Sequence, residues 1–165
     1  MALMDGKGCV ITGGAGSLGL ASARALLAEG AKVLLVDQSQ DDLDAATSGL
    51  AGEVLTQRAD VTRRKDTEAY ITKAVKAWGR IDLMFANAGV SGTNAPIADY
   101  PEDIFDKVMD VNIKGAFLAL KYAIPHMCSG GSIIVTSSIM GVQARPNSVA
   151  YITSKHALVG MVRCV

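Results

Sequence analysis

The sequence predicts an α/β fold in which helices cover both faces of a doubly wound parallel sheet. Short apolar runs alternate with helical patterns along the whole chain, as in proteins built from successive strand and helix units. Several of these runs, such as V-L-L-V and I-I-V, are continuously apolar, which is expected of strands buried on both faces. With 165 residues, half of them hydrophobic, the chain is long enough for one domain with a sizeable core.

The first predicted strand, Gly8–Thr12, leads through a glycine-rich loop into a helix at 17–29. Four residues of this helix are spaced to share one apolar face, namely Leu18, Ala21, Ala25 and Ala28. Gly30 ends this helix, and Gly79 ends the third one. Between and after them we predict a strand at 32–36, a weak helix at 40–50, a strand at 53–58, a helix at 66–78 and a strand at Ile81–Ala86.

The second half begins with one long helix, predicted at 101–127. Pro101 lies in its first turn, where proline is favoured. We expect this helix to bend near Asn112. The fifth strand is predicted at 132–137, and from Ser148 a further helical pattern runs to the last residue.

The charge pattern argues against partners that bind through strong electrostatic fields. Sixteen acidic and sixteen basic residues give a net charge of zero, and no basic block is longer than Arg63-Arg64-Lys65. We therefore expect neither nucleic acid nor a membrane surface as a partner. A small neutral or weakly charged substrate is compatible with this composition.

The cysteines and the first residues predict a reduced, cytoplasmic protein. Cys9, Cys128 and Cys164 lie far apart, without a C-x-x-C pair or clustered histidines, so we predict neither a metal site nor a disulfide framework. Residues 1–7 lack the apolar region and the cleavage site of a signal peptide. No window reaches the ~18 uninterrupted apolar residues of a membrane span.

The glycine-rich loop T-G-G-A-G-S-L-G, at 12–19, has the context of a dinucleotide site. It stands between a strand and a helix, and its glycines permit a tight turn and a close approach of the backbone to a ligand. The helix N-terminus offers unpaired N–H groups to a pyrophosphate. Asp37 ends the second strand eighteen residues after Gly19, where a carboxylate accepts hydrogen bonds from ribose hydroxyls. The pattern predicts a Rossmann-type cofactor site; a plain structural turn is the alternative.

Three positions beside this loop each have two interpretations. Asp37 also fits a cap on the following helix or a solvent-facing side chain. Asp60, in A-D-V-T after the third strand, fits an acceptor for an adenine amino group or a cap on the next helix. Asn87-Ala88-Gly89, after the fourth strand, fits a floor for a ligand at the carboxyl edge of the sheet or an ordinary turn.

The stretch 136–155 contains the residue types that proton-coupled redox chemistry on an alcohol needs. Tyr151 and Lys155 follow at i,i+4 spacing on one helix face, and Ser138 ends an apolar run. A tyrosine phenol titrates near pH ~10 in water, so acid–base use near neutrality requires a shift of ~3 units. A lysine ammonium ~4 Å away supplies about that much at an effective dielectric constant of ~20. Ser138 would hold the substrate oxygen beside the phenol. An amphipathic tyrosine with a snorkelling lysine is the alternative.

Together these motifs resemble the short-chain dehydrogenase/reductase family, in its shorter, non-extended branch. The resemblance rests on the glycine loop, Asp37, D-V at 60–61, N-A-G at 87–89, V-N-I-K-G around Asn112, Ser138 in S-S, and Y-x-x-x-K at 151–155, in register over nearly the whole chain. It implies a catalytic tetrad of Asn112, Ser138, Tyr151 and Lys155. It also implies a cofactor site formed by Gly13, Gly16, Ser17, Leu18, Gly19, Asp37, Asp60, Val61, Asn87, Ala88, Gly89, Tyr151 and Lys155.

The resemblance also assigns roles and an activity. Tyr151 becomes the acid/base, Ser138 orients the substrate oxygen, and Lys155 makes the phenol more acidic while binding the nicotinamide ribose. Asn112 holds a water that links Lys155 to solvent; without the other three residues, Asn112 would be better interpreted as a polar residue that bends the long helix. The implied function is an NAD-dependent oxidoreductase, in the broad sense an alcohol dehydrogenase, that interconverts a secondary alcohol and a ketone.

Two features depart from the family pattern. The usual T-G-x-x-x-G-x-G spacing places glycine where this chain has Ser17, with Gly16 before it. The spacing found here resembles the extended branch, but N-A-G belongs to the shorter one. The chain also ends within the helix that carries Tyr151, whereas family members continue through a sixth and a seventh strand and substrate-binding elements. The sequence therefore does not identify the substrate.

From the second departure we expect one NAD-binding domain over 1–165, incomplete at its carboxyl end. An unpaired apolar sheet edge, at the fifth strand or at the first, favours association into a homo-oligomer. We expect the 165-residue chain to be part of a longer natural protein or to self-associate. On its own we expect it to show no useful dehydrogenase turnover. The other interpretations are a non-catalytic dinucleotide-binding protein and a truncated chain without independent activity.

Overall fold

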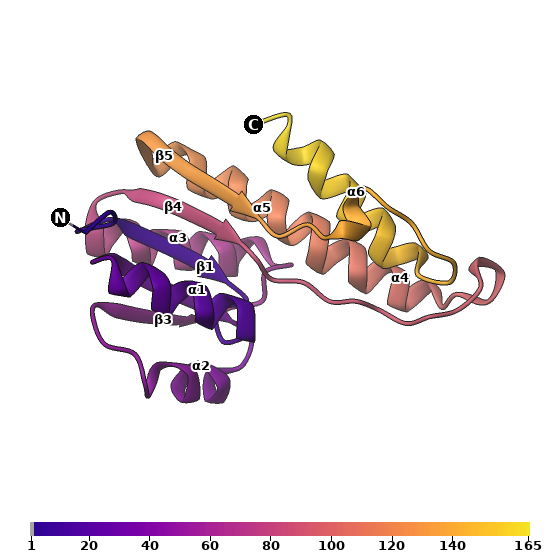
Figure 1. The fold of residues 1–165 in the computed structure, drawn as a ribbon, viewed down its shortest axis with the longest axis horizontal. Coiled ribbons are helices and arrows are strands. Elements are labelled where there is room, and N and C mark those ends of the chain that lie inside the picture. The colour runs from indigo at the N-terminus through magenta and orange to yellow at the C-terminus, as the bar shows by residue number, and fades with distance from the viewer. Residues whose placement is uncertain (1) are drawn as a thin grey trace.

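The computed structural model describes residues 2–165 and contains a five-stranded, all-parallel sheet (Figure 1). The strands follow the order β3-β2-β1-β4-β5. Their bounds are β1 (Gly8–Thr12), β2 (Lys32–Asp37), β3 (Val54–Arg58), β4 (Ile81–Ala86) and β5 (Met127–Val135). The chain builds outward from β1 to β3 and then crosses to β4 on the other side of β1. The strand order thus reverses between β1 and β4, and the crevice beyond the carboxyl ends at such a point is where ligands bind.

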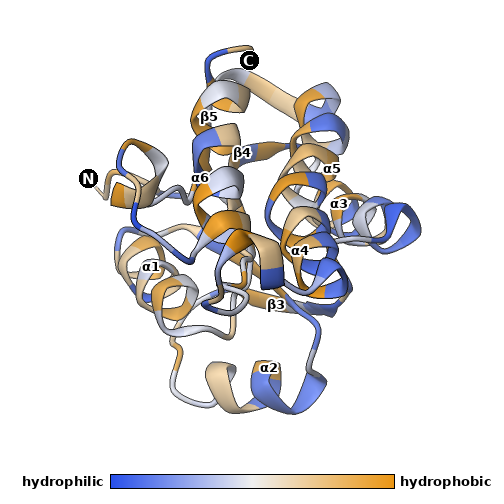
Figure 2. Ribbon diagram, turned by 90° about the vertical axis from the view of Figure 1, so that its right-hand side faces the viewer, coloured by the Kyte–Doolittle hydropathy of each residue, from blue (hydrophilic) through white to orange (hydrophobic). Residues whose placement is uncertain are grey.

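Helices cover both faces of this sheet, which confirms the predicted doubly wound α/β fold. On one face lie α1 (Ser17–Ala28) and α2 (Gln40–Thr47), and on the other α3 (Arg64–Trp78) and α5 (Gly115–Ala123). Beyond the carboxyl ends of the strands lies α4 (Glu102–Met109), and α6 (Val149–Val162) packs Leu158 into the core on the face covered by α3 and α5. Figure 2 shows hydrophobic residues along the strands and polar residues on the outer sides of α2 and α3.

The burial of each strand follows from its sequence and its place in the sheet. All residues of β1 and β4 are buried, and both strands have the predicted bounds. β5 is only partly buried, with Ile134 46% exposed, because it forms one edge of the sheet. The alternative that β1 forms the free edge is wrong, since β1 lies in the centre of the sheet.

The long helix predicted at 101–127 is divided. α4 ends at Met109, a π-helical segment η2 (Asp110–Lys114) follows, and α5 ends at Ala123. The π-helical turn lies at the predicted bend around Asn112. A short 3₁₀ turn, Ile124–His126, contains Pro125, which has no N–H to continue the helical ladder. As a result β5 begins at Met127 instead of at 132.

The apolar face predicted for α1 is also wrong. The buried residues of this helix are Gly19 and Ala23, while Leu18 is 53% exposed. The close approach of Gly19 to the carbonyl of Gly13 fixes the orientation of α1. As a result Leu18 faces a cavity instead of the core. Ala21, Ala25 and Ala28 are exposed as well.

Within residues 2–165, no helix combines the length and the apolar character needed to cross a lipid bilayer.

Candidate cofactor and active site

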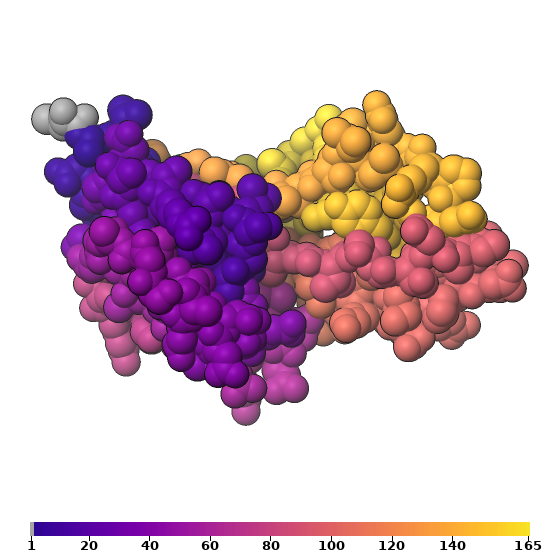
Figure 3. Space-filling view, turned by 60° about the horizontal axis from the view of Figure 1, so that its bottom comes forward, coloured from indigo at the N-terminus to yellow at the C-terminus, as the bar shows by residue number. Residues whose placement is uncertain are grey.

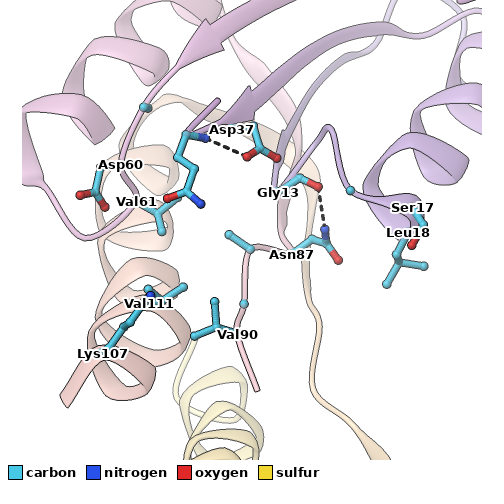
Figure 4. Close-up of a pocket in the computed structure, with 15 residues that line it drawn as sticks. Gly13, Ser17, Leu18, Asp37, Asp60, Val61, Asn87, Val90, Lys107 and Val111 are labelled. Carbon is cyan, nitrogen blue, oxygen red and sulfur yellow. Dashed lines mark hydrogen bonds between the residues drawn. The ribbon is translucent and has the colours of Figure 1, made fainter. Parts of the chain in front are cut away.

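A cavity of ≈ 370 Å³ opens at the carboxyl ends of the strands, at the point where the strand order reverses. Figure 3 shows the corresponding hollow between the indigo-to-purple first half of the chain and the pink-to-yellow second half. Except for Gly19, Tyr151 and Lys155, every predicted cofactor residue lines this cavity. The lining members of that set are Gly13, Gly16, Ser17, Leu18, Asp37, Asp60, Val61, Asn87, Ala88 and Gly89 (Figure 4).

The glycine loop has three positions, Gly13, Gly14 and Gly19, where a side chain would crowd its neighbours. A Cβ at Gly14 would lie 3.0 Å from the Cα of Leu35. Gly13 has φ 64°, and a Cβ there would lie 3.0 Å from the Cα of Ala88. A Cβ at Gly19 would overlap the carbonyl oxygen of Gly13. Gly16 is different, because a Cβ there would meet only that same oxygen, at 3.4 Å. α1 starts at Ser17. Having glycine at position 16 instead of 17 therefore leaves the close approaches of Gly13 and Gly19 unchanged.

Asp37 lines the cavity with a carboxylate that two backbone groups hold in place. The N–H of Ala15 donates to Oδ2 at 3.1 Å, and the N–H of Gln38 donates to Oδ1 at 2.8 Å. The N-cap of α2 is Ser39, so the interpretation of Asp37 as a helix cap is wrong. Because each carboxylate oxygen accepts two hydrogen bonds, both retain acceptor capacity for a ligand.

Asp60 stabilises its own turn and also lines the cavity. Its Oδ1 accepts from the N–H of Thr62 at 3.0 Å and from the Thr62 hydroxyl at 2.8 Å, while Arg63 lies 3.3 Å from Oδ2. Partial burial acts to raise the pKa of Asp60, but the Thr62 hydrogen bonds and the charges of Arg63 and Lys114 outweigh it and hold the pKa below its usual value. The N-cap of α3 is Arg63, so Asp60 is not the cap of that helix.

Asn87 joins the ends of three strands and does more than end an ordinary turn. Its Nδ2 donates to the carbonyls of Thr12 and Gly13 at 3.1 and 3.2 Å, and its Oδ1 accepts from the Thr136 hydroxyl at 2.9 Å. In return the Thr12 hydroxyl oxygen accepts from the N–H groups of Asn87 and Ala88. These contacts fix the floor of the cavity across β1, β4 and β5.

Tyr151 and Lys155 lie one turn apart on α6, beside the cavity. Lys155 is only 4% exposed, and its ammonium donates to the carbonyl of Thr136 at 2.7 Å. The ammonium nitrogen lies 5.6 Å from the centroid of the Tyr151 ring. A Cβ placed on Gly89, a cavity residue, would lie 3.6 Å from the same nitrogen. Burial lowers the pKa of Lys155. The snorkelling alternative is therefore wrong, because a snorkelling lysine keeps its ammonium in water.

Asn112 lies in the π-helical segment, and its amide group is almost fully used. Its Nδ2 donates to the carbonyl of Val90 and to the hydroxyl of Ser154, both at 2.9 Å, and its Oδ1 accepts from the N–H of Val90 at 2.8 Å. Ser154 in turn donates to the carbonyl of Tyr151 at 2.7 Å. Asn112 thus connects the segment after β4 to the turn that carries Tyr151, and one acceptor position on Oδ1 is left for a further partner.

Ser138 follows β5 and opens a 3₁₀ turn, η4 (Ile139–Gly141), that packs against α6. Its hydroxyl accepts from the N–H of Met140 at 3.1 Å, and it makes no hydrogen bond to Tyr151. The neighbouring Ser137 donates to the Lys155 carbonyl at 2.9 Å. The structure therefore places Tyr151 beside Lys155, links Asn112 to the Tyr151 turn through Ser154, and places Ser138 on a neighbouring turn that packs against α6.

Five further residues line the cavity without having been singled out by sequence: Gln38, Ala59, Val90, Lys107 and Val111. Three of these directly adjoin predicted residues, so the motif boundaries are simply wider than expected. Lys107 and Val111 come from α4 and η2 (Figure 4). Their i,i+4 spacing, ending one residue before Asn112, is the sequence signal that could have identified them.

Comparison with known proteins gives one consistent result. A family model described as short chain dehydrogenase matches residues 7–165. Levodione reductase of Leifsonia aquatica is 39% identical over 161 residues, covering 93% of this chain and 60% of that protein. The 2,5-dichloro-2,5-cyclohexadiene-1,4-diol dehydrogenase of Sphingobium indicum is 32% identical, covering 99% of this chain and 66% of that protein.

Solved structures agree in fold. The crystal structure of NAD+-bound xylitol dehydrogenase superposes with a TM-score of 0.93 at 36% identity, over 96% of this chain and 63% of that one. Carveol dehydrogenase from Mycobacterium avium, in complex with NAD, gives a TM-score of 0.93 at 28% identity. The chain spans 60% and 66% of the lengths of the two curated relatives.

Proposed function

The chain belongs to the short-chain dehydrogenase family, and from this premise we propose that it is an NAD-dependent oxidoreductase interconverting a secondary alcohol and a ketone. One observation carries the proposal. A buried lysine with a tyrosine one turn before it packs behind Gly89, which lines the cavity, so the Tyr151–Lys155 pair adjoins the site proposed for the cofactor. The bound dinucleotide would supply or accept the hydride there.

The residues around the cavity fit a dinucleotide. Gly13 leaves backbone, without a side chain, at the cavity wall, and α1 begins beside it with no acidic residue in its first turn. Such a helix N-terminus suits a pyrophosphate. The anchored Asp37 suits ribose hydroxyls, and Asp60 with Val61 suits the adenine end. The NAD complexes of the two structural neighbours support the same assignment.

The proposed chemistry assigns one task to each side chain. Tyr151 takes the proton of the alcohol during oxidation and returns it to the ketone oxygen during reduction, while the Ser138 hydroxyl holds that oxygen. The Lys155 ammonium, 5.6 Å from the centroid of the Tyr151 ring, would contact the nicotinamide ribose. Asn112 holds the segment after β4 against the Tyr151 turn, and its free acceptor position suits the relay water implied by the resemblance.

A non-catalytic dinucleotide-binding protein is the second candidate, and the state of Lys155 argues against it. Burying an ammonium costs several kcal/mol, and the hydrogen bond to Thr136 offsets only part of that. Cofactor binding alone would account for a lysine that contacts the ribose, but not for a tyrosine ring 5.6 Å from the lysine nitrogen. Titratable groups perturbed in a cleft are typical of catalytic sites.

The test combines a binding titration with a substrate screen. NADH is titrated against the protein by its fluorescence, with ADP-ribose as competitor, and a panel of secondary alcohols and ketones is then screened with NAD and NADH. We expect NADH to bind with a Kd below ~1 mM and at least one alcohol–ketone pair to turn over. Absence of NADH binding would overturn the proposal, and binding without turnover in the natural form of the protein would support the second candidate.

A further inference from the structure

A second cavity, of ≈ 440 Å³, adjoins the first at Asp37. Gly16 and Asp37 line both cavities, so the second one opens beside the carboxylate assigned to the ribose hydroxyls. Its remaining lining residues are Ala15, Leu20, Asp42, Ala45 and Ala46. We propose that Asp42 is a second determinant of cofactor choice, acting with Asp37 to exclude the 2′-phosphate of NADP. This inference rests on the proposed binding of NAD.

The second cavity has room for a phosphate, so shape alone does not exclude one. Apart from Leu20 and the two aspartates, its walls are alanine and glycine. A 2′-phosphate on a ribose held at Asp37 would lie next to this space, because Asp37 lines both cavities. The obstacle is therefore charge: both ionisable side chains of the lining are carboxylates, and a phosphate brings about −1.5 to −2 charges beside them.

Neither carboxylate is neutralised by a neighbour. Within residues 2–165, no lysine or arginine lies within ion-pair distance of Asp37 or Asp42. Arg58 pairs with Asp37 in strand register, but its guanidinium donates to the carbonyl of Gln38 and lines neither cavity. A phosphate entering the second cavity would thus meet two negative charges without a compensating cation in the wall.

The backbone donors of this wall are also taken. The N–H of Ala15 donates to Asp37, and the N–H of Asp42 donates to the Ser39 hydroxyl at 3.2 Å. Ser39 is the N-cap of α2, so its hydroxyl already satisfies the Asp42 N–H at this helix end. A phosphate would gain neither a salt bridge nor these two hydrogen bonds.

The size of the effect follows from the charges. A carboxylate about one Debye length, ~8 Å, from a phosphate of about −2 charge weakens binding roughly tenfold at an effective dielectric constant of ~20, after screening reduces the interaction to about a third. Asp42→Asn should therefore lower the ratio Kd(NADPH)/Kd(NADH) about tenfold. Asp37→Asn should also lower the ratio, and the double variant should lower it further than either single one.

Asp41→Asn is the matched control. Asp41 belongs to the same first turn of α2 and its replacement removes the same charge, but Asp41 does not line the cavity. The measurement is a fluorescence titration of NADH and NADPH against wild type and the four variants, at low and at high salt. We expect Asp41→Asn to change the ratio less than twofold and high salt to narrow the preference of the wild type.

Each outcome decides between the possibilities. An Asp42→Asn ratio that matches that of Asp41→Asn would overturn the assignment of Asp42, while Asp37 could still discriminate alone. A wild-type preference that does not respond to salt would show exclusion by shape and overturn the charge mechanism. If the wild type binds neither NADH nor NADPH, the proposed function itself fails, and the inference fails with it.

Discussion

Replacement of Lys155 by methionine should stabilise the fold while it weakens the cofactor site. The lysine is 4% exposed, and its ammonium has one hydrogen bond, to the Thr136 carbonyl at 2.7 Å. Burying an ammonium costs several kcal/mol, whereas a charged hydrogen bond returns about 2 kcal/mol. Methionine fills nearly the same volume without a charge. We expect Lys155→Met to raise the free energy of unfolding at neutral pH by about 1 kcal/mol, or Tm by roughly 3 °C.

The pH dependence of the free energy of unfolding tests the burial of Lys155 more specifically than the stability at one pH. Burial places the folded-state pKa of Lys155 below the unfolded value of ~10.4. The folded state therefore binds this proton less tightly than the unfolded chain does. The stability contribution is fully present above the unfolded pKa and is lost as pH falls through the folded pKa. Wild type should gain stability as pH rises toward ~10.4, and Lys155→Met should lack this rise.

Urea denaturation at several pH values measures the change in stability and its pH dependence. NADH titration of the same samples measures the loss of cofactor affinity. Lys155→Arg keeps the charge and serves as the comparison for packing damage. The reasoning is refuted if Lys155→Met is destabilised at neutral pH by more than ~1 kcal/mol and its stability changes with pH as the wild type's does. Unchanged NADH affinity would remove Lys155 from the cofactor site.

Three further predictions concern the glycines and the sheet edge. Gly19→Ala should lower the free energy of unfolding, measured with denaturant, by about 1–3 kcal/mol, because the added Cβ overlaps the Gly13 carbonyl. Gly16→Ala should change it by less than ~0.5 kcal/mol. Equal losses for the two variants would contradict the loop geometry. Gly141→Ala should cost a similar 1–3 kcal/mol, because its Cβ would overlap the Ser137 hydroxyl; unfolding at wild-type denaturant concentrations would count against this. The 165-residue chain should self-associate through the β5 edge in analytical ultracentrifugation, and Ile134→Lys should reduce this; a monodisperse wild-type monomer would contradict it.

The sequence predicts best those elements whose local signals are strong. β1 and β4 are mostly apolar, apart from Thr12 and Asp82, and have clear boundaries, so their predicted bounds are confirmed. β5 is harder, because its first residues, M-C-S-G-G, carry no strand pattern. Their pairing with β4 is irregular, with a register shift between Ile81 and Leu83. These residues are extended because they pair with β4, which their own sequence does not indicate.

Within the candidate site, residue types are predictable and contacts are not. Asp37 can be placed at the end of a strand from sequence, but its hydrogen bond from Ala15 joins residues 22 positions apart. The burial of Leu18 is predicted wrongly because helical periodicity cannot show that Gly19 must pack on a carbonyl. Lys107 and Val111 reach the cavity only because the helix is split by a π-helical turn and crosses the strand ends.

The turnover of Tyr151→Phe beside wild type tests the acid–base assignment most directly. The substitution keeps the ring on α6 and removes only the hydroxyl, so NADH affinity serves as the internal control. In the natural form of the protein, with any alcohol or ketone that the wild type accepts, we predict a loss of kcat of about 10²–10⁴-fold while the Kd for NADH changes less than about threefold. A variant that retains most of the wild-type turnover on every accepted substrate would contradict the assignment of Tyr151 as the acid/base.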